Sequence, residues 1–123
     1  MPTELQHFIA GKKVKGRSGR SGSVYDPATG ALAAKAPLAS RSEVEGAIAS
    51  AAAAFPAWAA TSPLSRARVM FKFKELVERN ADEVARLISS EHGKVLSDAK
   101  GSLIRGLEVV EFACGIPHLL KGE

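Results

Sequence analysis

Apolar side chains recur at every third or fourth position in the C-terminal half of the chain, which is the spacing of an amphipathic helix. A first helix is predicted between Asn80, a favourable N-cap residue, and Gly93, a favourable C-terminal stop. Its apolar positions are Val84, Leu87 and Ile88. A second, longer helix is predicted from the stripe Leu103, Leu107, Val110 and Cys114. Each stripe needs a surface to pack against.

Two more helices are predicted upstream. Ser40 and Glu43 have the spacing of a capping box, and apolar residues follow at helical spacing as far as Phe55. We expect Pro56 to end this helix and Trp58 to lie in the linker after it, folded back onto the helices.

The next helix is predicted to begin at Ser62, with Pro63 at its first helical position. Its predicted buried face consists of Val69, Met70, Phe73, Leu76 and Val77, and the opposite face carries Arg68, Lys72, Lys74, Glu75 and Glu78.

Residues 1–39 predict strands instead of helices. Two short strands are expected on either side of a turn at Gly11-Lys12, followed by a mobile loop from Gly16 to Gly22. Asp26 to Gly30 has the residues of a tight turn, with a strand before it and a weakly alternating partner after it. Pro37 confines that partner to a sheet edge or a strand end.

The predicted organisation is therefore a β-hairpin and strand region, residues 1–39, followed by a helical region, residues 40–123. Two or three short strands cannot cover the apolar stripes of four helices. We therefore expect residues 1–123 to form a single incomplete domain.

Composition narrows the class of protein. The net charge is +4, and it arises in the first 24 residues, where Lys12, Lys13, Lys15, Arg17 and Arg20 stand against Glu4 alone. This cluster lacks interleaved aromatic residues and a recognition motif, so no nucleic-acid partner is expected. No apolar run is long enough for a membrane helix, no segment has the pattern of a secretion signal, and one cysteine permits no internal disulfide. A cytoplasmic location is expected.

Several motifs, in this order along the chain, carry a family resemblance. They are His7-Phe8-Ile9-Ala10-Gly11, Asp26-Pro27-Ala28-Thr29-Gly30, Phe55-Pro56-Ala57-Trp58, Glu91-His92-Gly93-Lys94 and the stretch from Arg105 to Glu123. The chain resembles the N-terminal portion of the aldehyde dehydrogenase superfamily. The stretch from Gly106 to Glu123 is most similar to the CoA-acylating branch that acts on methylmalonate semialdehyde.

The resemblance implies an α/β fold: the N-terminal part of a Rossmann-like NAD-binding domain, with short strands followed by about four helices. It also implies an NAD-dependent oxidation of methylmalonate or malonate semialdehyde to an acyl-CoA, in valine and pyrimidine breakdown. The expected partners are the remainder of the same enzyme, the semialdehyde, and further copies in a homo-oligomer, a tetramer. By the same resemblance, the nucleophile and the NAD and CoA sites lie in later sequence, so the segment alone is expected to be inactive.

The motifs within the chain give no catalytic, cofactor-binding or metal-ligating residue. Gly93-Lys94 is not a phosphate loop, because Ile88 stands where the first glycine is needed. Gly16, Gly19 and Gly22 do not have the spacing of a dinucleotide fingerprint. Cys114 continues the apolar stripe, so we expect a buried cysteine and not a nucleophile.

The histidines His7, His92 and His118 are too scattered to predict a metal site. Glu91 is expected to cap or orient the turn between the last two helices, since no partner group for a general base is visible. The resemblance implies that many family members carry an acid near Ser102 that holds a structural cation. A serine at that position argues against such a cation in this chain.

Two alternatives remain at the level of sequence. The chain could belong to a different aldehyde dehydrogenase, or it could be a small non-enzymatic helical module that acts through its apolar stripes.

Overall fold

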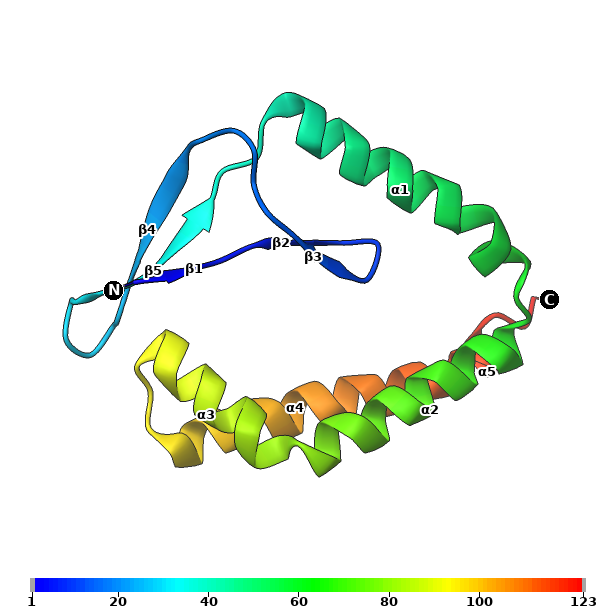
Figure 1. Ribbon diagram of the computed structural model, residues 1–123. Helices are drawn as coiled ribbons and strands as arrows, with labels where there is room; N and C mark the ends of the chain where they lie inside the picture. Colours follow the sequence, from blue (N-terminus) through cyan, green and yellow to red (C-terminus); the bar gives the residue numbers. More distant parts are fainter. Residues whose placement is uncertain (1, 123) are drawn as a thin grey trace. The chain divides into compact units, whose positions relative to one another are not determined.

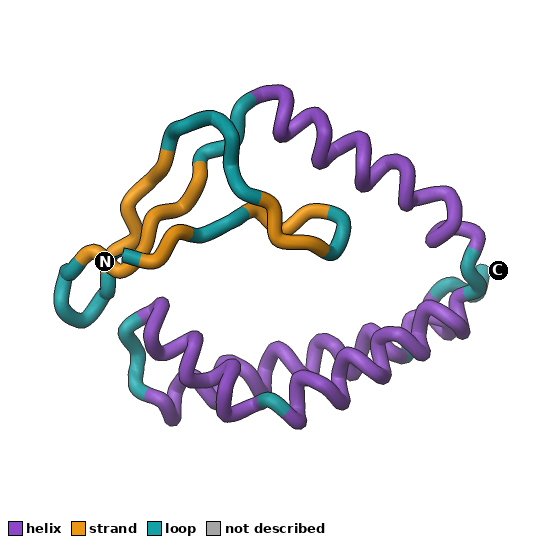
Figure 2. Tube along the Cα trace, in the orientation of Figure 1, coloured by secondary structure: helices purple, strands orange, loops and turns teal. Residues whose placement is uncertain are grey.

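The computed structural model describes residues 2–122, in which short strands precede the helices (Figures 1 and 2). The strands are β1 (Thr3–Glu4), β2 (His7–Ile9), β3 (Lys12–Val14), β4 (Ser21–Tyr25) and β5 (Leu32–Pro37). The helices are α1 (Arg41–Ala60), α2 (Pro63–Arg79), α3 (Ala81–His92), α4 (Leu96–Cys114) and α5 (Ile116–Leu119). The chain divides after Ala60 into two compact units, the first with the strands and α1 and the second with α2 to α5.

A three-stranded sheet in the first unit has the order β1-β5-β4. The hairpin β4–β5 is antiparallel, whereas β1 adds to β5 in parallel and places Thr3 opposite Ala34. The sequence did not predict β1, because two residues are too few to show a period. Pro37 is the last residue of β5, as expected, since a proline cannot donate to the ladder.

The predicted hairpin at residues 7–14 is confirmed as β2–β3, but its turn lies one residue before the predicted Gly11-Lys12, because Lys12 already pairs with Ile9. Its turn residues, Ala10 and Gly11, both have positive φ, at 52° and 74°. Two successive left-handed residues are typical of a tight hairpin turn. The loop that follows is shorter than predicted, because β4 begins at Ser21 and includes Gly22. Gly22 pairs with Ala36 of β5, and this backbone pairing holds in a strand a glycine whose residue type indicates a loop.

The tight turn at Asp26 to Gly30 is also confirmed. One carboxylate oxygen of Asp26 accepts from the backbone nitrogens of Ala28 at 2.8 Å and Thr29 at 3.0 Å. These two hydrogen bonds, first that from Ala28 and then that from Thr29, lower the pKa of Asp26. Gly30 has a φ of 72°, which a residue with a side chain rarely adopts.

Helix α1 does not end at Pro56, contrary to the prediction, and continues to Ala60. Proline removes one backbone hydrogen bond, but the surrounding alanines are the strongest helix formers and the helix has only one further turn to run. Trp58 therefore lies in α1 and not in a linker. Its side chain is 48 % exposed, which is more than expected of an indole folded back onto the helices.

In the second unit, α4 packs against both α2 and α3. The predicted start of α2 is confirmed, because the Ser62 hydroxyl accepts from the backbone nitrogen of Ser65 at 3.2 Å. Asn80 separates α2 from α3, but its side chain does not cap α3. It donates instead to the carbonyl of Leu76 at 2.7 Å and so satisfies the end of α2.

The predicted stripe of α4 is confirmed: Cys114 is buried, and Leu103, Leu107 and Val110 are half-buried. The predicted face of α2 is partly wrong. Its inward positions are Ala67, Met70, Lys74 and Val77, whereas Val69, Phe73 and Leu76 are exposed. Two apolar stripes lie side by side on α2, and only contact with α4 decides between them.

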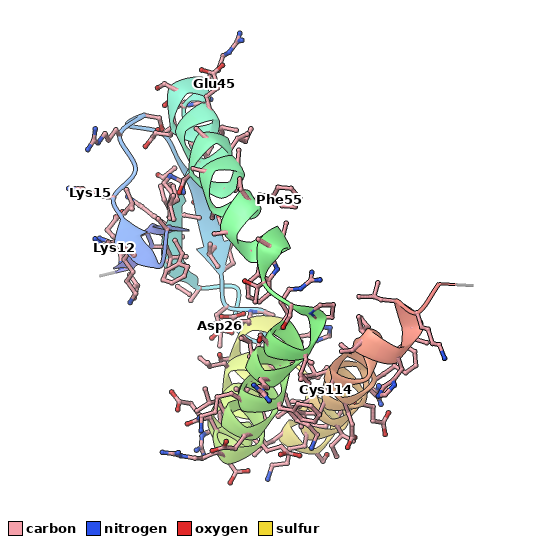
Figure 3. The ribbon with its side chains drawn as sticks, turned by 90° about the vertical axis from the view of Figure 1, so that its right-hand side faces the viewer. Lys12, Lys15, Asp26, Glu45, Phe55 and Cys114 are labelled. Carbon is pink, nitrogen blue, oxygen red and sulfur yellow. The ribbon has the colours of Figure 1, made fainter. Side chains whose placement is uncertain are left out.

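The core of the described residues is small. Its buried side chains are Ala34, Ala67, Ala85, Ala99 and Cys114, and none of them is large. Small side chains let the helix backbones approach closely, but they remove little apolar surface from water. Most large apolar residues are exposed, including Phe55, which projects from α1 (Figure 3).

Candidate functional site

The turn between α3 and α4 is the most polar, hydrogen-bonded feature of the second unit. Gly93 ends α3 with a φ of 81°, and its nitrogen donates to the carbonyl of Ser89 at 2.9 Å. The prediction that Gly93 ends this helix is therefore confirmed, and the residue does so in the left-handed conformation. The turn brings Lys94 back over the first two turns of α4.

The ammonium of Lys94 is held by α4. Its Nζ lies 2.8 Å from Asp98 Oδ2 and donates to Ser102 Oγ at 2.7 Å. The Lys94 side chain is 18 % exposed, so most of its surface is covered by neighbouring protein atoms. The hydrogen bond from Lys94, and secondly its charge, lowers the pKa of Asp98.

Other charged contacts join the helices of this unit. Lys100 on α4 pairs with Asp82 on α3 at 2.7 Å, and that hydrogen bond lowers the pKa of Asp82. Lys74 on α2 bonds Glu78 at 2.6 Å and lies 3.9 Å from Glu111 on α4. The sequence placed Lys74 on the outer face, but its long side chain lies between α2 and α4, so that prediction was wrong.

In the first unit, Glu43 connects the start of α1 to the loop after β3. The predicted capping box is confirmed: Glu43 Oε2 accepts from the Ser40 nitrogen at 2.8 Å, and Ser40 Oγ accepts from the Glu43 nitrogen at 3.3 Å. The other carboxylate oxygen accepts from the backbone nitrogen of Arg17 at 2.7 Å. These bonds, that from the Ser40 backbone first, lower the pKa of Glu43 to about 2.

A shallow groove lies between the β2–β3 hairpin and α1. It has a volume of about 470 Å³ and is lined mostly by apolar side chains, among them Phe8, Ile9, Val44 and Ile48. Glu43 and His7 stand at its polar end. No serine, threonine, cysteine or lysine side chain is among its lining residues, which are mostly apolar, so the groove has the character of a packing surface.

The residues considered for chemistry are not brought together. His7 belongs to the first unit and His92 and His118 to the second, and no group of three His, Cys, Asp or Glu side chains in residues 2–122 could hold a metal ion. Cys114 is 6 % exposed within the helical unit (Figure 3). Glu91 is exposed and, within the part of the chain that the structure describes, makes no hydrogen bond to the turn, so its predicted capping role lacks support.

The contact from Lys94 to Asp98 and Ser102 was missed by the sequence reasoning. The signal was the spacing of four residues from 94 to 98 and again from 98 to 102. It was hidden because Lys94 precedes α4 and does not belong to it.

Among residues 2–122, no helix is long and apolar enough to cross a membrane.

Comparison with known proteins now adds the family. The profile described as the aldehyde dehydrogenase family matches residues 13–123. The chain is 50 % identical over 119 residues to a malonate-semialdehyde dehydrogenase of Pseudomonas aeruginosa. It is 45 % identical over 123 residues to the human mitochondrial methylmalonate-semialdehyde/malonate-semialdehyde dehydrogenase (acylating). These matches cover 97 % and 100 % of the chain but only 24 % and 23 % of the relatives.

Comparison with solved structures leads to the same family of enzymes. A structure of methylmalonate-semialdehyde dehydrogenase from Oceanimonas doudoroffii aligns over 100 % of the chain with a TM-score of 0.93 and 54 % identity. A structure from Sinorhizobium meliloti, described as the same kind of enzyme and complexed with NAD, aligns over 100 % of the chain with a TM-score of 0.95 and 52 % identity. The chain covers 25 % of each of these two structures.

Proposed function

The chain belongs to the aldehyde dehydrogenase family, and from that membership we propose that it forms part of an NAD-dependent, CoA-acylating dehydrogenase of methylmalonate and malonate semialdehydes. The sequence identity of 52 % and 54 % to two solved structures described as methylmalonate-semialdehyde dehydrogenases, one of them complexed with NAD, carries the proposal. The lactaldehyde dehydrogenase of Escherichia coli is less similar, at 25 % identity. This difference favours the semialdehyde branch over another substrate.

In this proposal, the segment formed by this chain has a structural role. The described core holds only small side chains, while large apolar residues on α1, α2 and α4 are exposed. A fold with so little buried apolar surface is poorly stabilised by itself. We therefore propose that the remainder of the same enzyme covers these faces, and that the enzyme assembles as a homo-oligomer, a tetramer.

The residues of this chain do not fit an NAD site of their own. Gly16, Gly19 and Gly22 lead into the antiparallel hairpin β4–β5, not from a strand into a helix N-terminus. A pyrophosphate site of the dinucleotide type needs a glycine-rich turn that opens a helix. The proposal accordingly assigns NAD, CoA and the nucleophile to sequence beyond this segment.

A segment exchange tests the proposal. The matching segment of the Pseudomonas aeruginosa enzyme is replaced by this chain, and NADH formation is followed with malonate semialdehyde and CoA. We expect activity in the hybrid and in its Cys114→Ser variant, and none with the isolated chain. A well-folded hybrid without activity, or an isolated chain whose NADH formation depends on Cys114, would contradict the proposal.

The cytoplasmic location stays a prediction, because the human relative is named as mitochondrial.

A further inference from the structure

The α3–α4 turn raises a question about a bound cation. The family resemblance implies a structural cation near residue 102, held by an acid, and this chain has a serine there. Whether the residues present fit such an ion depends on which oxygens around Ser102 are free. Hard cations such as Na⁺, K⁺, Mg²⁺ and Ca²⁺ are bound by several oxygen atoms at once.

The oxygens are already engaged by positive groups. Ser102 Oγ accepts from Lys94 Nζ at 2.7 Å and from Arg105 Nη2 at 3.2 Å. The one carboxylate in this cluster, Asp98, is paired with Lys94 at 2.8 Å. A metal ion at Ser102 would displace both donors from the hydroxyl and meet two positive side chains with one carboxylate. The residues therefore do not fit a bound metal ion.

We propose that the α3–α4 turn of this chain binds no metal ion at Ser102, and that the Lys94 ammonium ties the turn to α4 through Asp98 and Ser102. Its contacts to Asp98 and Ser102 connect the turn to the first two turns of α4, which is what a bridging ion would do. The need for such a bridge is visible in the backbone. Val95 stands at the N-cap of α4 and makes no side-chain cap, so Lys94 adds a side-chain link to the backbone hydrogen bonds that the Val95 carbonyl accepts.

The geometry of Gly93 supports this assignment. Because Gly93 is left-handed, the chain reverses at once and places Lys94 beside α4, at the low exposure of 18 %. A lysine at the N-terminus of a helix opposes the helix dipole and is favourable only with a compensating anion. Asp98, in the first turn of α4, supplies that anion.

The inference predicts that the chain has no requirement for a specific cation. Hydrogen exchange of the Asp98 and Ala99 amides, which both donate to the Val95 carbonyl, reports the local stability of this turn. In the unchanged chain we expect equal protection in NaCl, KCl and tetramethylammonium chloride at one ionic strength. Sodium NMR of the same sample is expected to show no saturable binding.

Variants of Lys94 then separate the effect of its ammonium group on stability from the effect of the rest of the turn. Lys94→Met keeps an apolar stem of similar length and is expected to lower protection of the two amides about threefold, the size of a partly buried ion pair. The double variant Lys94→Met with Ser102→Asp supplies two carboxylates against one remaining positive side chain, Arg105, so its protection should become greater in NaCl or KCl than in tetramethylammonium chloride. Lys121→Met is the matched control, because Lys121 is exposed and lies outside the helices.

Two results would overturn the inference. One is saturable sodium or potassium binding by the unchanged chain, with cation-specific protection at Asp98 and Ala99. The other is a Lys94→Met chain that keeps full protection in all three salts. Both readouts are independent of dehydrogenase activity, so neither outcome depends on the proposed enzyme function.

Discussion

The carboxylate of Glu43 lies 2.7 Å from the backbone nitrogen of Arg17, a residue 26 positions earlier in the chain. The same side chain completes the capping box with Ser40. The carboxylate of Glu43 therefore caps the start of α1 and also holds the loop between β3 and β4 against that helix.

This contact should respond to acid. The pKa of Glu43 is about 2 in the folded chain, below the ordinary value of 4.5. A lowered folded-state pKa contributes stability above the unfolded value, and that stability is lost as the pH falls. We expect the Arg17 amide to keep its protection from exchange above pH 4.5 and to lose it between pH 4.5 and about 2.

The control for this acid response is another carboxylate on the same helix. Glu43→Gln should remove the response of the Arg17 amide, whereas Glu45→Gln should leave it intact, since Glu45 pairs with Arg41 on the surface. An Arg17 amide that responds equally in both variants would show that Glu43 does not hold the loop. The measurement is amide exchange by NMR as a function of pH.

Gly93 and Gly106 offer a matched pair of glycine substitutions. Gly93 has a φ of 81°, so Gly93→Ala should cost about 1 kcal/mol of stability, because a Cβ disfavours the left-handed conformation. Gly106 lies inside α4, and no atom outside its own helical turn comes within 4 Å of the point where a methyl group would sit. Gly106→Ala should therefore stabilise the chain by about 0.5–1 kcal/mol. The stabilities of the two variants are compared by denaturant unfolding or by amide hydrogen exchange in the α3–α4 region. Equal effects of the two substitutions would contradict the assignment.

Gly16 is expected to be intolerant for a different reason. A Cβ at this position would lie 2.6 Å from Pro37 Cβ and 3.4 Å from His7 Nε2, so the loop cannot stay where it is. We expect Gly16→Ala to destabilise the first unit, seen as faster exchange in β5. Gly46→Ala, in α1 with open space around it, should not destabilise that unit. A Gly16→Ala chain with unchanged exchange in β5 would refute the close approach.

The isolated chain is expected to self-associate or to bind an apolar dye strongly. The reason is that Val69, Phe73 and Leu76 form one exposed stripe on α2, and Phe112 on α4 and Phe55 on α1 are also exposed. Large apolar side chains that are exposed together favour self-association or a loosely packed state. Sedimentation and dye fluorescence test this, and replacing Val69, Phe73 and Leu76 by polar residues should weaken both. A compact monomer with sharp unfolding and no dye binding would instead favour the non-enzymatic module.

Local rules predicted most of the elements. The capping box at Ser40, the turn at Asp26 and the helix end at Gly93 each depend on a few neighbouring residues, and the structure confirms all three. The continuation of α1 past Pro56 was missed, because the balance between one lost hydrogen bond and several alanines is too fine to predict from the pattern.

The sequence by itself determined the capping box that begins α1, the start of α2, the turn at Asp26 and the helix end at Gly93, because each depends on a few consecutive residues. The order of its motifs indicated the family. The tertiary structure alone decided which of two apolar stripes on α2 faces α4, and that Lys74 lies between those helices. It also decided that Glu43 reaches Arg17 and that Lys94 reaches Ser102. These contacts join residues that are not neighbours in the sequence, and the energy that selects them comes from burial and pairing across elements, which periodicity does not record.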